Sequence, residues 1–280
     1  MKVSAIVVCY NRETEIGPCL RSLRFADEVV AVDSFSTDGT AEIARRFANA
    51  CYQHPYTFPG NQKNWAIDRT SHPWIVAIDS DEIIPGELQD EILRELQCPR
   101  FDNYRVYRRN YLFGREMKHA AWKTDTVAIL FRKDRYRFLA DAPHSDVVPR
   151  GSHGFLKARL IHHPHQSIDE FVAKSSSYAA GTARKYFREG RRGTALKMFL
   201  HPGFNFLKNY ILRGGFRDGA PGLISAVLST GYVAEKYARL WELGQTEGKG
   251  WNGPGSDRRP DTGGNTDEPR RDPDDRAWPR

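Results

Sequence analysis

The apolar residues Ile75–Ile78 run directly into Asp79, Ser80, Asp81 and Glu82, and this junction limits the possible folds most strongly. A short apolar run bounded by turn-forming residues predicts a strand buried in a mostly parallel sheet. Ligands of such sheets bind beyond the carboxyl ends of the strands, where Asp79 and Asp81 are placed. Two carboxylates there suit a divalent cation that also holds phosphate oxygens. The alternative is a solvated strand end that caps the next helix.

Strands and helices are expected to alternate along the first part of the chain. Apolar, β-branched runs at Val3–Cys9 and 28–32 predict strands, and an amphipathic stretch follows each of them. Asn11 is placed to cap the first helix. Asp33 ends the second strand, where such folds often hold a nucleoside, although a cap or turn residue is the alternative. The pattern predicts an α/β fold with a Rossmann-like, mostly parallel central sheet flanked by helices.

Composition and charge limit the class of protein. The apolar fraction of 40% supports a real core, and four cysteines without CxxC spacing suggest reduced, buried thiols of a cytosolic protein. Met1 and Lys2 lead directly into a strand pattern, so no signal peptide is expected, and no run of 18 apolar residues predicts a membrane span. Residues 150–217 hold 13 Lys/Arg and three acids, which predicts an anionic surface or partner.

Helices are expected over 168–188, 195–212 and 220–243, and they form a basic, aromatic-rich region. Such helices either pack in a core or lie in a membrane interface. From Gly244 onward apolar residues nearly vanish, which predicts a disordered tail. The expected organisation is an α/β domain at 1–160 that carries the acidic pair, a helical extension at 161–243 that is a candidate membrane-associating region, and a tail at 244–280.

Histidines and acids of the middle region are further candidates. Asp141, His144 and Asp146 are candidates for a general base, and each is otherwise a surface polar residue. Three histidines cluster at 162–165, but adjacent ones point apart and Pro164 interrupts any regular face. A dedicated metal site is therefore not expected there, although one imidazole would be able to reach a diphosphate or its metal.

Several segments together resemble the family 2 glycosyltransferases with the GT-A fold, and more narrowly the WaaE/KdtX-like branch of lipopolysaccharide-core glucosyltransferases. The resemblance covers residues 1–243. The segments that carry it are Ala5–Asn11, Val32–Thr40, Gly60–Asn64, Ile78–Glu82, Pro143-His144 and Gly215–Gly219.

The resemblance implies that 1–160 is a nucleotide-sugar-binding and catalytic domain with a donor site. Tyr10 would stack on the base, Asp33 would bind the nucleoside, and Lys63 would approach the phosphates. Asn11 and Asp79 belong to the same matching segments and are further donor-binding candidates.

The resemblance also implies a metal and a base. Asp79 and Asp81 would form the metal-binding pair for Mg²⁺ or Mn²⁺, with Asp81 the more direct ligand. Relatives often place an acid directly after the histidine of the Pro-His pair, where this chain has Ser145. Asp146 therefore ranks first as the base, then Asp141, with His144 as a third candidate.

The implied reaction is an inverting transfer of a hexose, with glucose expected, from a UDP-sugar to a lipid-linked saccharide such as the lipopolysaccharide inner core. The protein would be cytoplasmic and peripheral on the anionic inner face of the cytoplasmic membrane, with no nucleic-acid partner. Another cell-surface polysaccharide or lipid carrier is an alternative acceptor.

Two other classes compete with this interpretation. A nucleotidyltransferase shares the α/β core, but it would need a Gly- and Arg-rich signature where this chain has Val8–Arg12. A non-catalytic protein that binds anionic lipid or nucleic acid would leave the strand-end carboxylates unexplained, because they repel phosphate unless a metal intervenes.

Overall fold

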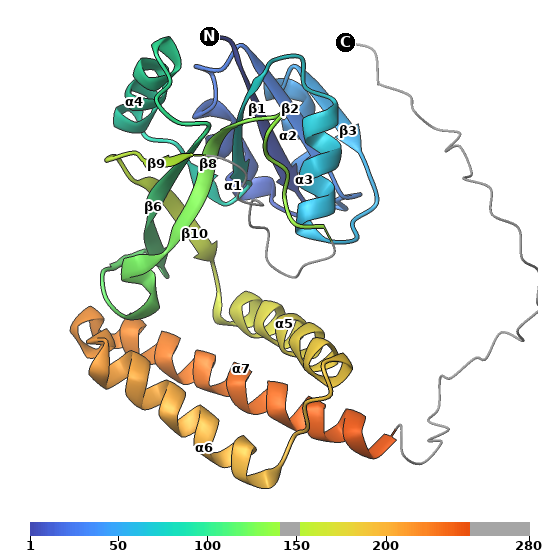
Figure 1. The fold of residues 1–280 in the computed structure, drawn as a ribbon, viewed down its shortest axis with the longest axis vertical. Helices are drawn as coiled ribbons and strands as arrows, with labels where there is room; N and C mark the ends of the chain where they lie inside the picture. The colour runs from blue at the N-terminus through green and yellow to red at the C-terminus, as the bar shows by residue number, and fades with distance from the viewer. Residues whose placement is uncertain (141–151, 247–280) are drawn as a thin grey trace, which may run out of the picture.

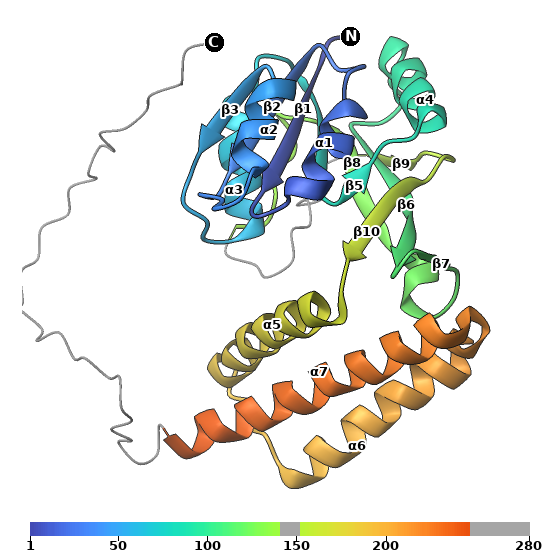
Figure 2. The ribbon, with the colours of Figure 1, turned by 180° about the vertical axis from the view of Figure 1, so that it is seen from behind.

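A computed structural model describes residues 1–140 and 152–246 (Figures 1 and 2). The strands are β1 (Val3–Cys9), β2 (Glu28–Asp33), β3 (Ala50–Gln53), β4 (Trp74–Asp79), β5 (Glu82–Ile83), β6 (Asn103–Leu112), β7 (Arg115–Met117), β8 (Thr126–Arg132), β9 (His153–Phe155) and β10 (Leu160–His165). The helices are α1 (Glu13–Arg21), α2 (Thr40–Phe47), α3 (Pro59–Asp68), α4 (Gly86–Gln97), α5 (Ile168–Arg188), α6 (Ala195–Phe206) and α7 (Gly219–Thr246), with short turns η1 (Ala120–Thr124), η2 (Leu207–Leu212, a π-helix) and η3 (Gly215–Asp218).

One sheet organises the first part of the molecule, in the strand order β3-β2-β1-β4-β8-β6-β10-β5, and both β7 and β9 pair with β6. Strands β3 to β4 of this order are parallel, whereas β8 runs antiparallel to both of its neighbours. The chain order reverses between β1 and β4, and the carboxyl ends of strands at such a reversal are where open α/β sheets bind ligands. The expected α/β fold class is confirmed.

Alternating side chains of the central strands build a core on each face of the sheet. In β1, Ala5 and Val7 belong to the core cluster that includes residues of α1, α2 and α4, whereas Ile6 belongs to the cluster that includes residues of α3. Both faces exclude water, so β1 and β4 consist almost entirely of fully buried residues. This explains why these strands appear in the sequence as continuous apolar runs rather than as alternating patterns.

Helices α5, α7 and α6 form a layer beside the sheet, with α7 between the other two (Figure 1). Ser176 of α5 donates to Glu235 of α7 at 2.6 Å. The layer is tied to the sheet side by Asp218, whose carboxylate accepts the His119 backbone N–H and lies 2.7 Å from the His119 ring. Within residues 1–140 and 152–246, no helix is both long and apolar enough to cross a bilayer.

Two local expectations, on Asn11 and on the end of the last helix, need correction. Asn11 does not cap α1: it adopts a positive φ of 49° and accepts the Thr37 N–H at 2.8 Å, which holds the loop after β2. Pro164 lies within β10, and the β6–β10 register shifts next to it, in keeping with the interruption expected there. Helix α7 continues past Gly244 to Thr246, whose hydroxyl bonds back to the Glu242 carbonyl.

The cysteines are free, as expected, but only part of the burial expectation holds. Cys9 and Cys19 are buried, Cys51 is half-buried and Cys98 is exposed.

The sheet also continues beyond the expected domain boundary at 160, because β10 pairs with β6 up to His165.

Candidate active site

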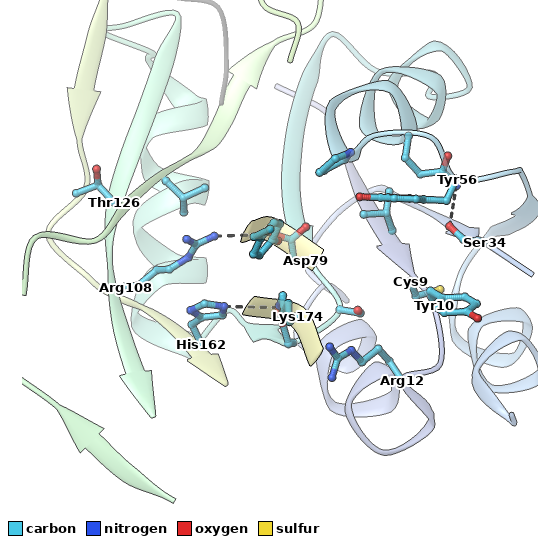
Figure 3. Close-up of a pocket in the computed structure, with 17 residues that line it drawn as sticks. Cys9, Tyr10, Arg12, Ser34, Tyr56, Asp79, Arg108, Thr126, His162 and Lys174 are labelled. Carbon is cyan, nitrogen blue, oxygen red and sulfur yellow. Dashed lines mark hydrogen bonds and ion pairs between the residues drawn. The ribbon is translucent and has the colours of Figure 1, made fainter. Parts of the chain in front are cut away.

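A cavity of about 550 Å³ opens at the carboxyl ends of β1 and β4, where the strand order reverses (Figure 3). Figure 3 shows Arg108 and His162 approaching from one side of Asp79, and Tyr10, Ser34 and Tyr56 from the other. The cavity is lined by Val8, Cys9, Tyr10, Arg12, Ser34, Tyr56, Pro59, Gln62, Asp79, Ser80, Asp81, Arg108, Thr126, Val127, His162, Lys174 and Tyr178.

Asp79 is held in the charged form by two cations. Its Oδ1 lies 2.7 Å from the buried Lys63 ammonium, and its Oδ2 lies 3.9 Å from the Arg108 guanidinium. Burial alone would raise the pKa of Asp79, but Lys63 and Arg108 outweigh it and hold the pKa at about 2. Lys63 therefore lies beneath the cavity and is engaged by Asp79 rather than projecting freely into it.

Arg108 of β6 bridges three acids on one side of the cavity. Its guanidinium donates to the fully buried Glu82 at 2.6 Å and lies 3.4 Å from Asp125. Burial raises the pKa of Glu82 to about 7, and the nearby charges of Asp79 and Asp81 add to this rise although Arg108 opposes it. The network joins β4, β5, β6 and the turn before β8 through a single side chain.

Asp81 is a buried carboxylate with one unpartnered oxygen. Its side chain is 8% exposed, and Oδ1 has no hydrogen-bond partner within the described part of the chain. His162 Nε2 lies 3.7 Å from this oxygen, and Lys174 lies 3.9 Å from Oδ2. An unpartnered buried carboxylate oxygen is costly unless a donor or a cation fills the position. The site therefore fits a cation beside Asp81.

His162 reaches Asp81 because β5 and β10 pair with His162 opposite Glu82. Its Nδ1 lies 2.6 Å from Asn110 Oδ1, so the ring orientation is fixed and Nε2 faces Asp81. Burial lowers the pKa of His162 to about 4, which leaves a neutral imidazole able to bind a metal. One histidine of the cluster thus does reach the acidic pair.

The described residues do not supply a complete metal site by themselves. Across 1–140 and 152–246, no group of three or more His, Cys, Asp and Glu residues is arranged to hold an ion. Asp81 and His162 would supply two ligands, since Asp79 is engaged by Lys63. An ion held there would need further oxygens from a bound ligand, which is how Mg²⁺ and Mn²⁺ sites at phosphates are commonly built.

The remaining donor-site candidates differ in their placement. Tyr10 lines the cavity and is 56% exposed, so its ring is available to a ligand. Asp33 is fully buried, accepts from Ser36 and from Gln53 Nε2 at 3.2 Å, and does not line the cavity. Asn11 does not line the cavity either. In this structure both residues shape the loop after β2, while the neighbouring Ser34 faces the cavity.

Helix α5 contributes two residues that sequence reasoning did not single out. Lys174 and Tyr178 are one helical turn apart, so they share a face, and both line the cavity. The four-residue spacing of Lys174 and Tyr178 is the sequence feature that could have placed them on the same face of the helix. Arg12 forms an ion pair with Glu170 and fixes the start of α5 against α1.

The base candidates Asp141, His144 and Asp146 lie outside the described residues.

Comparison with known proteins gives consistent matches. The model described as Glycosyl transferase family 2 matches residues 4–155. The chain is 30% identical to the "Lipopolysaccharide core biosynthesis glycosyltransferase LpsC" of Rhizobium meliloti, over 86% of this chain and 93% of the relative. It is 24% identical to an uncharacterized glycosyltransferase of Rickettsia conorii, over 90% and 93%. The crystal structure of S. aureus TarS 1-349 with UDP aligns with a TM-score of 0.47 at 20% identity, covering 90% and 92%.

Proposed function

The chain belongs to glycosyl transferase family 2, and on this premise we propose that it is an inverting, metal-dependent hexosyltransferase. The donor would be a UDP-sugar, with glucose as the first candidate, and the acceptor a lipid-linked saccharide such as the lipopolysaccharide inner core. Support for this acceptor comes from the rhizobial relative, whose name places it in lipopolysaccharide core biosynthesis.

One observation carries the proposal: Asp81, whose buried Oδ1 has no partner among the described residues, lines a cavity that is also lined by cations. Carboxylates alone would repel a diphosphate, and a site that binds phosphate through cations alone does not require a buried carboxylate. A diphosphate with a bound metal ion explains both kinds of residue, because the ion binds the carboxylate and the phosphates contact Lys174 and Arg12. The cavity volume of about 550 Å³ lies within the usual range for small-ligand sites.

The acids and the histidine at the cavity would have separate roles in the reaction. Asp81 and His162 would hold Mg²⁺ or Mn²⁺, with Asp79 beside them as the acid that pairs with Lys63, and the bound ion would neutralise charge on the leaving diphosphate. Asp79 also pairs with Lys63, whose ammonium lies 2.7 Å from Asp79 Oδ1. The acceptor hydroxyl oxygen bonds to the anomeric carbon as the bond to the diphosphate oxygen breaks. Asp146, ahead of Asp141 and His144, is the proposed acceptor of the hydroxyl proton.

A donor screen tests the proposal. UDP-glucose with Mn²⁺ is expected to raise the melting temperature of the protein, because a ligand at a hundred times its Kd stabilises by about 2.7 kcal/mol. EDTA should remove most of the shift, since the diphosphate then meets Asp81 without an ion. GDP- and dTDP-sugars serve as matched ligands in the same thermal-shift assay. A larger shift with a GDP-sugar would overturn the UDP-glucose assignment, and no shift with any nucleotide would contradict the enzyme proposal.

Tyr10 gives a test of the nucleoside end. Tyr10→Ala is expected to weaken UDP binding by about tenfold, because loss of stacking on a base costs about 1–3 kcal/mol. Isothermal titration calorimetry with UDP and Mn²⁺ measures the change, and Tyr10→Phe, which keeps the ring, should bind nearly as wild type. Equal affinity of the alanine variant would exclude stacking by Tyr10.

We also propose that the protein works on the inner face of the cytoplasmic membrane. The support is electrostatic: residues 150–217 hold 13 Lys/Arg and three acids, and anionic headgroups attract such a region. A lipid-linked acceptor would be reached at the same surface.

A further inference from the structure

Helix α6 and the following turn η2 expose a large apolar surface, here named the α6–η2 face. Phe199 is 80% exposed, Leu212 68% and Leu196 66%, and the only buried residue of α6 is Pro202. Exposed phenylalanine and leucine side chains in a contiguous group mark an interaction site. The face consists of Leu196, Phe199, Leu200, Phe204, Leu207, Ile211 and Leu212.

The exposed side chains follow one side of the helix, because they recur at spacings of three or four residues. Another part of α6 packs on α7: His201 stacks on Tyr237 of α7 with ring centroids 4.6 Å apart, and Pro202 is buried. In both views of the ribbon, α6 is the outermost helix of its layer, on the far side of α7 from α5 (Figures 1 and 2). The α6–η2 face therefore points away from the rest of the described molecule.

The positive charge around the α6–η2 face favours an anionic partner. Residues 190–217 contain no acidic residue and six basic ones, Arg191, Arg192, Lys197, Lys208, Arg213 and Arg217. A second copy of this chain would bring the same positive charges against one another. A bilayer with anionic headgroups matches both the apolar side chains and the positive charge of this region. Its acyl region accepts the apolar side chains, and its headgroups attract the cations.

We propose that the α6–η2 face is the membrane-docking surface, and that it inserts into the headgroup–acyl boundary of an anionic bilayer. The inference deepens the proposed function, on which it rests, by naming the residues that meet the membrane. Helix α5, which lines the donor cavity with Lys174 and Tyr178, belongs to the same helical layer. Docking would thus hold the cavity at a fixed height above the lipid surface.

The test compares binding of the full chain to vesicles of phosphatidylcholine alone and to vesicles that also contain about 30% phosphatidylglycerol, which supplies the anionic headgroups. Wild type is expected to co-sediment with the anionic vesicles only. The double variant Phe199→Ser/Leu200→Ser should lose at least about tenfold in partition coefficient, because each lost side chain removes buried apolar area. Leu93→Ser on α4, where the leucine is 40% exposed, is the matched control and should bind as wild type.

Two outcomes would overturn the inference. One is equal binding of the double variant and wild type. The other is a wild-type dimer in sedimentation velocity that the double variant abolishes, which would assign the face to a second copy. Hydrolysis of UDP-sugar in the absence of lipid separates this test from the function itself, since the double variant should retain it. Loss of vesicle binding with retained hydrolysis supports the docking surface, whereas absent hydrolysis in wild type contradicts the proposed function alone.

Discussion

Asp81→Asn is expected to lower UDP-sugar turnover about a thousandfold, the upper range for removal of one group that stabilises charge in a transition state. The amide is nearly the same size as the carboxylate, so the fold should persist. It nevertheless removes the anionic oxygen that has no partner other than the proposed cation within the described residues. UDP release from UDP-glucose with Mn²⁺ measures the effect, and the variant should need more Mn²⁺ for half-maximal rate.

Asp134→Asn is the matched control for this substitution. Asp134 is exposed and paired with Arg132 at 2.7 Å in the turn after β8, and it does not line the cavity. Its turnover should equal that of wild type. If Asp81→Asn retained more than about a tenth of the wild-type rate, the role of Asp81 in holding a metal would be refuted.

Arg108→Met is expected to destabilise the protein by about 3 kcal/mol at pH 8, because removing one partner of a buried ion pair leaves the other charge uncompensated. Glu82, the uncompensated acid, is almost fully buried. Burial already raises the pKa of Glu82 to about 7, and loss of Arg108 raises it further. At pH 6 the folded variant keeps Glu82 protonated, so the loss of stability should be smaller there than at pH 8.

Urea unfolding at the two pH values measures this loss. The double variant Arg108→Met/Glu82→Gln should recover much of the stability, since it leaves no buried charge at the position of Glu82. A double variant as unstable as Arg108→Met would mean that the guanidinium acts mainly through Asp125 or Asp79. An unchanged unfolding midpoint in the single variant would contradict the predicted role outright.

The alternation of strands and helices in the first part of the chain and the position of the acidic pair were predictable from the sequence. Parallel strands buried on both faces leave continuous apolar runs, and the carboxyl ends of β1 and β4 must meet at one edge of the sheet. The location of Asp79 and Asp81 at this edge therefore follows from local pattern alone. Tyr10, at the end of β1, reaches the same cavity for the same reason.

Contacts that depend on distant pairings were not predictable in this way. Arg108 looks in the sequence like one of several arginines on an alternating strand, and its burial depends on the register of β6 with β8 and β10. The sequence does not distinguish His162 from the other two histidines of its cluster, because the β5–β10 pairing is what orients it. The expected contact of Asp33 with a nucleoside remains a prediction, because its oxygens are bonded within the loop here.

Lys174 and Tyr178 line the cavity but lie outside residues 4–155, which the family model matches. The cavity is thus formed by the matched segment together with His162 of β10 and helix α5, which both lie beyond it. Under the proposed function, a chimera that carries α5–α7 of a relative on this sheet would therefore change in donor affinity. Divergence of these helices would then alter the choice of donor while every residue of the acidic junction stays the same.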